Sequence, residues 1–84
     1  MDIRTLRIFI DVAERCSFTK AANALGYSQS TVSFQIKQLE EELGVKLLER
    51  INHTVTLTDR GREVLRYAHQ IDQLSREMDR AVQT

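Results

Sequence analysis

The chain has 84 residues and zero formal net charge, with 42% hydrophobic and 29% charged residues, a composition that predicts one small folded domain and excludes disorder. The absence of proline and the presence of only three glycines argue against an all-β fold, and the single cysteine, Cys16, excludes an intrachain disulfide and a cysteine-rich zinc site. No apolar run approaches the roughly 18 residues that span a membrane, and the first residues lack the apolar region of a signal peptide, so we expect a cytoplasmic protein without a membrane partner.

A first helix is predicted from about Asp2 to Arg15. Apolar residues recur there at three- and four-residue steps and predict one buried stripe: Ile3, Leu6, Ile10 and Ala13, with Phe9 beside them. Ser17 is a good N-cap for a short second helix from Phe18 to Leu25, and Gly26 follows where helices often end in a left-handed conformation. We interpret Cys16 as a small, semi-buried apolar residue rather than a redox sensor.

A third helix is predicted from Gln29 to Leu43, with Ser28 as its N-cap and Gly44 as its end. Its apolar residues are spaced by four, three and four and should form one buried stripe: Val32, Ile36, Leu39 and Leu43. The outward surface then carries hydroxyls, an amide, one aromatic and one cation: Ser30, Thr31, Ser33, Phe34, Lys37 and Gln38. No Asp or Glu occurs between Arg15 and Leu39, so a polyanion can approach this face although the net charge is zero.

This outward surface suits a nucleic acid. Hydroxyls and amides near a helix N-terminus can bond to base edges or phosphates, and an exposed Phe34 can meet a thymine methyl group. The alternative is that Phe34 folds back onto the following segment or contacts a partner subunit.

Two short stretches with alternating apolar residues predict a β-hairpin, Val45 to Arg50 and Val55 to Leu57. Arg50, Asn52 and His53, near its tip, can reach a phosphate or a minor groove. The alternative is an ordinary polar turn in which His53 is solvated and Arg50 pairs with Glu49 or a helix acid. Helices two and three, joined by a tight turn, would form a helix-turn-helix, and the hairpin behind them a wing.

Thr58 caps a long final helix predicted from Asp59 to about Gln83. Roughly 25 residues give a rod of about 37 Å, too long for so small a domain to cover. Heptad positions place apolar residues along one coiled-coil seam: Val64, Tyr67, Ile71, Leu74, Met78 and Ala81. We therefore predict a symmetric homodimer, the alternative being a helix packed only on its own domain. Three other apolar residues widen this stripe, namely Leu65, Ala68 and Val82. Three arginines near the start of the helix can stay with the DNA-facing side, namely Arg60, Arg62 and Arg66.

No enzyme is predicted. The two histidines, His53 and His69, lie on different elements, and neither has a carboxylate or cysteine at ligand spacing. Neither a phosphate-binding glycine loop nor a nucleophile motif is present. We expect no metal site and no cofactor, and we interpret His69 as a surface residue.

Five correctly spaced segments resemble the N-terminal domain of LysR-type transcriptional regulators: Phe18-Thr19-Lys20-Ala21-Ala22 through Leu25, Ser28-Gln29-Ser30-Thr31-Val32-Ser33, Gln35-Ile36-Lys37-Gln38-Leu39-Glu40, Leu43-Gly44-Val45-Lys46-Leu47-Leu48-Glu49-Arg50 and Leu57-Thr58-Asp59-Arg60-Gly61. The resemblance extends over essentially all 84 residues. The resemblance implies a mainly α, winged helix-turn-helix domain in residues 1–58, made of three helices and a two-stranded β wing. It implies a linker helix in residues 59–84 that pairs antiparallel in a homodimer. It also implies binding to bacterial promoter DNA, and a small-molecule effector domain that would follow the linker helix.

The resemblance also assigns candidate DNA-binding residues. In the family the third helix enters the major groove and the wing tip the minor groove. Base-reading positions correspond to Gln29, Ser30, Ser33 and Phe34, backbone-contacting positions to Thr31, Lys37 and Thr58, and wing positions to Asn52 and His53. Two further candidates do not come from the resemblance: the periodicity of the third helix adds Gln38, and the predicted hairpin adds Arg50. Two positions that are commonly Arg in the family are Phe34 and His53 here, so we expect a shallower salt dependence and a preference for thymine near Phe34.

Two other functions remain open on sequence. One is a different winged-helix DNA-binding protein, such as the molybdate-responsive regulators. The other is a dimeric module whose winged domain docks onto a protein. A docking helix would more often expose Leu or Trp anchors than the small polar residues found on the third helix.

Overall fold

Each helix begins where the sequence supplies a side-chain oxygen to cap it. The structure, a computed structural model that describes residues 1–52 and 54–83, contains in that part α1 (Ile3–Arg15), α2 (Phe18–Leu25), α3 (Gln29–Leu43), β1 (Leu48–Ile51), β2 (Thr54–Leu57) and α4 (Asp59–Val82). In each case the cap accepts from the backbone N–H three residues on, and the four caps are Asp2, Ser17, Ser28 and Thr58. The predicted helices and their starts are therefore confirmed.

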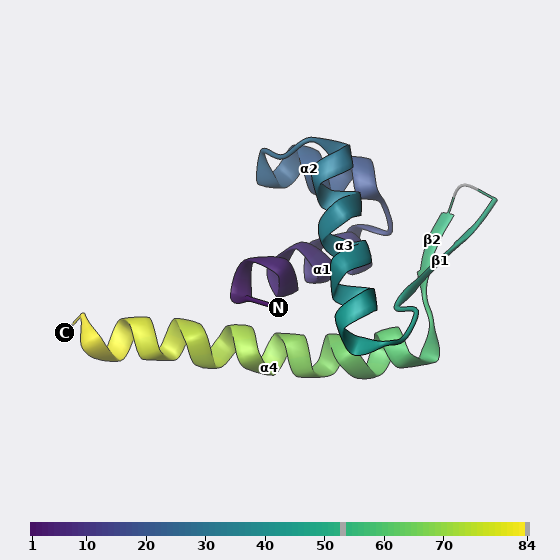
Figure 1. The fold of residues 1–84 in the computed structure, drawn as a ribbon. Coiled ribbons are helices and arrows are strands. Elements are labelled where there is room, and N and C mark those ends of the chain that lie inside the picture. Colours follow the sequence, from purple (N-terminus) through teal and green to yellow (C-terminus); the bar gives the residue numbers. More distant parts are fainter. Residues whose placement is uncertain (53, 84) are drawn as a thin grey trace.

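The helices α1, α2 and α3 gather into a bundle that lies against α4, and the hairpin projects beside the N-terminal end of α4 (Figure 1). The C-terminal part of α4 extends past the bundle (Figure 1), which gives the molecule extents of 48 × 26 × 19 Å. The described residues include no helix with the length and hydropathy of a membrane span.

The hydrophobic core lies where α1 meets the other elements. Buried side chains come from every helix and from the hairpin: Leu6, Ile8, Phe9, Val12, Ala21, Ala22, Val32, Ile36, Leu39, Leu47, Leu48, Val55 and Ala68. The stripe predicted for α1 was partly wrong, since Ile3, Ile10 and Ala13 are only half-buried while Ile8 and Val12 are fully buried. The reason is that α1 contacts α2 and α3 as well as α4, so that its buried face is wide and centres on Phe9.

Two further burial predictions were wrong, and both concern helix ends. Leu43 was expected in the buried stripe of α3, but it is the last residue of that helix and 38% of its surface is exposed. Cys16 was expected to be semi-buried, but it is exposed and ends α1 in the left-handed conformation, with φ of 54°.

The hairpin is shorter at its start than predicted and longer at its tip. Strands β1 and β2 pair in antiparallel register from Leu48↔Leu57 to Ile51↔Thr54, whereas residues 45–47 are not strand. The segment before β1 is held by other elements: the Glu40 carboxylate on α3 accepts from Leu47 N at 2.8 Å and from Leu48 N at 3.3 Å. The Leu47 carbonyl accepts from Thr58 N at 3.0 Å. This tie fixes the wing to both α3 and the start of α4.

Helix α4 packs closely at its N-terminal end because Gly61 has no side chain. A Cβ built at Gly61 would overlap the Leu47 carbonyl oxygen, so this position is occupied by glycine despite its weak helix propensity. Farther along, Arg7 Nε on α1 donates to Asp72 at 2.6 Å, and His69 Nε2 lies 3.1 Å from the Glu14 carboxylate. These contacts set the direction in which α4 leaves the bundle.

Candidate nucleic-acid interface

The outward face of α3 is open to solvent. Gln29, Ser30, Thr31, Phe34, Lys37 and Gln38 are exposed, and Ser33 is half-buried. Phe34 has 57% of its surface exposed, so it does not fold back onto the hairpin in this chain. The helix-turn-helix thus presents small polar groups, one cation and one aromatic ring on the same ridge.

The N-terminal end of α3 carries a hydroxyl network. Ser28 Oγ lies 2.8 Å from Thr31 Oγ1 and 3.2 Å from Ser30 Oγ. Thr19 Oγ1, on α2, donates to Gln29 Oε1 at 3.3 Å. A helix N-terminus carries partial positive charge, and α3 has no acidic residue in its first turn, so this end of the helix is suited to a phosphate.

A groove of about 780 Å³ separates α3 from the wing. Three candidate residues line it, namely Ser33 and Lys37 from α3 and Arg50 from β1. Glu40 and Glu49 line it too, so the acid-free windows of the sequence do not produce an acid-free groove. The Glu40 carboxylate accepts from the Leu47 and Leu48 amides and lies 3.9 Å from Lys46 Nζ.

Arg50 does not pair with an acid among the described residues. Its Cζ lies 4.3 Å from the centre of the Phe18 ring, across the space between β1 and α2. The same two side chains line a second hollow, of about 320 Å³, with Gln29 and Thr19. Sequence reasoning missed the contacts that Phe18 makes with Arg50 and that Glu40 makes with the Leu47 and Leu48 amides, because both contacts join separate elements.

Several candidate residues lie apart from the α3 groove. Asn52 is at the tip of the hairpin with φ of 50°, and His53 lies outside the described residues. The Thr58 hydroxyl donates to the Lys46 carbonyl at 2.6 Å and accepts from Gly61 N at 2.9 Å, so its proton is committed inside the protein.

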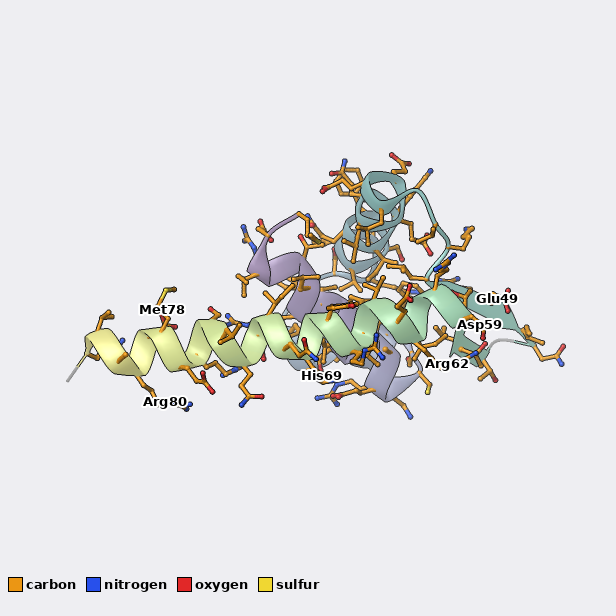
Figure 2. The ribbon with its side chains drawn as sticks, turned by 90° about the horizontal axis from the view of Figure 1, so that it is seen from below. Glu49, Asp59, Arg62, His69, Met78 and Arg80 are labelled. Atoms are coloured by element: carbon orange, nitrogen blue, oxygen red, sulfur yellow. The ribbon has the colours of Figure 1, made fainter. Side chains whose placement is uncertain are left out.

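The three arginines near the start of α4 bind within their own helix or its approach. Arg60 NH1 lies 3.1 Å from Glu63, Arg62 pairs with Asp59, and Arg66 lies over the ring of Tyr67. Figure 2 shows Asp59 and Arg62 near the wing end of α4, with Glu49 nearby. Each of these arginines therefore has a partner close to it in sequence. Among the described residues, no group of three potential ligands has the arrangement of a metal site.

A second exposed surface runs along α4. The seam predicted from heptads is solvent-exposed at Tyr67, Ile71, Leu74, Met78 and Ala81, whereas Val64 is half-buried against the core. Leu74 and Met78 have 64% and 61% of their surfaces exposed. In Figure 2, Met78 and Arg80 point to opposite sides of the part of α4 that extends past the bundle. The helix therefore packs on its own domain with one face and leaves an adjacent apolar face uncovered.

Comparisons with known proteins agree with this geometry. A family model described as bacterial regulatory helix-turn-helix protein, lysR family, matches residues 3–62. The RuBisCO operon transcriptional regulator of Allochromatium vinosum is 44% identical over 84 residues, which are 100% of this chain and 28% of that protein. The regulator IlvY of Escherichia coli (strain K12) is 47% identical over 70 residues, 83% of this chain and 24% of that protein. The chain thus spans about a quarter of the length of these relatives.

Solved structures match over nearly the whole chain. The BenM DNA-binding domain in complex with benA site 1 DNA is 41% identical with a TM-score of 0.94, covering 99% of this chain and 96% of that one. The complex of the CbnR DNA-binding domain with DNA is 40% identical with a TM-score of 0.89, covering 96% and 94%. The chain therefore belongs to the LysR family of bacterial transcriptional regulators and folds as the winged helix-turn-helix DNA-binding domain of that family, followed by a long C-terminal helix.

Proposed function

We propose that the chain binds a two-fold symmetric duplex DNA site as a homodimer, with α3 in the major groove and the wing at the adjacent minor groove. The observation that carries the proposal is the outward face of α3 from Gln29 to Gln38, which carries no acidic residue and lies beside a groove lined by Lys37 and Arg50. The fold it shares with two domains solved on DNA supports the same orientation.

The residues on the outward side of α3 divide by the chemistry that they offer. Gln29, Ser30 and Ser33 supply hydrogen-bonding groups for base edges, and the Phe34 ring supplies an apolar contact for a thymine methyl. Lys37 and the Thr31 hydroxyl suit phosphates, as do Gln38 and the wing residue Asn52. Thr58 contributes by fixing the start of α4 against Lys46, since its hydroxyl proton is already donated there. We also propose His53 as a DNA-contacting residue of the wing, on the basis of the family resemblance.

The dimer follows from the uncovered face of α4. A row of large apolar side chains on a helix of 24 residues is a self-complementary surface that a second copy can cover. Two-fold symmetry would then place two α3 helices on one side of the duplex, reading two half-sites. Dimers built from DNA-binding domains commonly gain their specificity in this way.

Selection of binding sites from random duplexes tests the proposal, followed by a salt titration on the enriched sequence. We expect a two-fold symmetric motif and a linear fall of log affinity with log salt concentration. A library without enrichment would contradict sequence-specific binding and would favour a protein-docking module.

Two matched variants of α3 separate base reading from backbone contact. Phe34→Ala should weaken binding mainly to sites with thymine at the contacted position, by roughly 5- to 10-fold, because only the methyl contact is lost. Lys37→Ala should weaken binding about equally across sequences and lower the salt slope by about one. An equal loss for Phe34→Ala on all sequences would refute the assignment of that ring.

A further inference from the structure

Arg50 occupies an unusual place in the wing. It pairs in register with Val55, which is buried, so its side chain leaves the inward face of the hairpin rather than the solvent face. Instead of entering the core, the guanidinium reaches α2 and lies over the Phe18 ring, with Arg50 Cζ 4.3 Å from the ring centre. Of the hairpin residues that the structure describes, 48–52 and 54–57, Arg50 is the only cation.

Phe18 provides a fixed platform for this cation. It is the first residue of α2, directly after the Ser17 cap, whose hydroxyl accepts from Lys20 N at 3.0 Å. The ring is half-buried and packs against the hydrophobic core. The contact therefore joins the wing to the helix-turn-helix through a ring that is itself anchored.

Stacking leaves the hydrogen-bonding edge of the guanidinium free. An arginine on an aromatic ring uses its planar face, while its five N–H donors lie in the plane and suit a phosphate. Within the described residues, the Arg50 guanidinium donates no hydrogen bond and forms no ion pair, and it contacts the Phe18 ring. It lines both hollows between the wing and the helices, one shared with Ser33 and Lys37 and the other with Thr19 and Gln29.

We propose that Phe18 is a positioning residue that holds Arg50 at the junction of α3 and the wing, with its free edge presented to one DNA backbone phosphate. The inference rests on the proposed function, because a strand that passes from the major groove at α3 to the minor groove at the wing must cross this junction. A stacked guanidinium loses less side-chain freedom on binding than a mobile one, so the ring increases the affinity of a contact that it does not itself make.

A double-mutant cycle on the selected duplex tests this coupling. Arg50→Ala should weaken binding about 10-fold and lower the salt slope by about one, because one phosphate contact is lost. Phe18→Leu, which keeps an apolar side chain, should weaken binding roughly 3- to 10-fold when Arg50 is present and have almost no effect when Arg50 is Ala. Phe18→Trp should bind more tightly than Phe18→Leu and close to the unchanged chain, since the larger ring also attracts a guanidinium. Arg80→Ala, at the far end of α4, is the matched loss of one cation and should leave the salt slope unchanged.

A purely structural role for Phe18 predicts a different result. Phe18→Leu would then weaken binding by the same factor with and without Arg50, and that outcome would overturn the inference, as would an unchanged salt slope in Arg50→Ala. Melting by circular dichroism shows whether Phe18→Leu alters folding. If it does, a fluorinated phenylalanine at position 18, which keeps the shape of the ring and weakens its attraction for a cation, must reproduce the Arg50-dependent loss.

Failure of the unmodified chain to bind any selected duplex would contradict the proposed function, whereas binding without Phe18–Arg50 coupling would contradict this inference alone.

Discussion

Truncation of Leu74 tests whether the uncovered face of α4 is a dimer interface. Fully burying a leucine side chain is worth about 1.5–3 kcal/mol, and 64% of Leu74 is exposed in the single chain. Covering that remainder is therefore worth roughly 1–2 kcal/mol per copy. A two-fold dimer contains the residue twice, so Leu74→Ala should weaken association by about 2–4 kcal/mol, which raises the dimer dissociation constant roughly 30- to 900-fold.

Sedimentation equilibrium over a concentration series measures this change directly. Gln73→Ala is the matched control, because Gln73 lies on another face of α4 and bonds only to Glu77 at 3.2 Å among the described residues. It should leave the dissociation constant within about two-fold of that of the unchanged chain. Equal dissociation constants for Leu74→Ala and Gln73→Ala would refute a dimer interface on this face. So would an unchanged chain that stays monomeric at tens of micromolar, roughly where a micromolar dissociation constant gives mostly dimer.

Three other predictions concern the contacts that position the wing and α4. Gly61→Ala should lower the free energy of unfolding by about 1–2 kcal/mol, seen as a lower melting midpoint, because the new Cβ displaces the Leu47 carbonyl; an unchanged midpoint would contradict the tight packing. The Arg7 guanidinium lowers the pKa of Asp72 below its usual 3.8, so its stabilising contribution is present above that value and is lost as the pH falls through the folded-state pKa. Asp72→Asn should therefore cost about 1 kcal/mol at neutral pH in urea titrations, with the difference shrinking below about pH 4, and a pH-independent difference would count against it. Glu40→Ala should speed hydrogen exchange at the Leu47 amide and its neighbour while Glu40→Gln, which keeps an acceptor, has a smaller effect; unchanged exchange in both would remove the role given to Glu40.

The helices could be predicted from the sequence because their limits are set locally. Ser17, Ser28 and Thr58 each cap a helix through the backbone three residues ahead, and Gly26 and Gly44 end α2 and α3 with positive φ. Periodicity likewise identified which face of α3 is exposed. These features depend on neighbours within one or two turns, which a sequence displays directly.

Contacts between elements could not be predicted in the same way. The stretch before β1 has the alternation of a strand, but its Leu47 amide donates to the Glu40 carboxylate on α3 instead of to the opposite strand. Arg50 was expected at a phosphate or an acid, and nothing near it in sequence points to Phe18, 32 residues earlier. The exposure of Leu43 depends on where the bundle ends, which is a property of the assembled helices.

The most direct test of duplex recognition by α3 and the wing is an NMR titration of the isotope-labelled chain with the selected duplex. We predict that the largest amide shifts fall on residues of α3, such as Ser30, Thr31 and Lys37, and on Asn52 and Arg50 of the wing. The amides around Met78 on α4 should change little, since that segment extends past the bundle. Shifts confined to α1 or α4, with the outward face of α3 unaffected, would contradict the account.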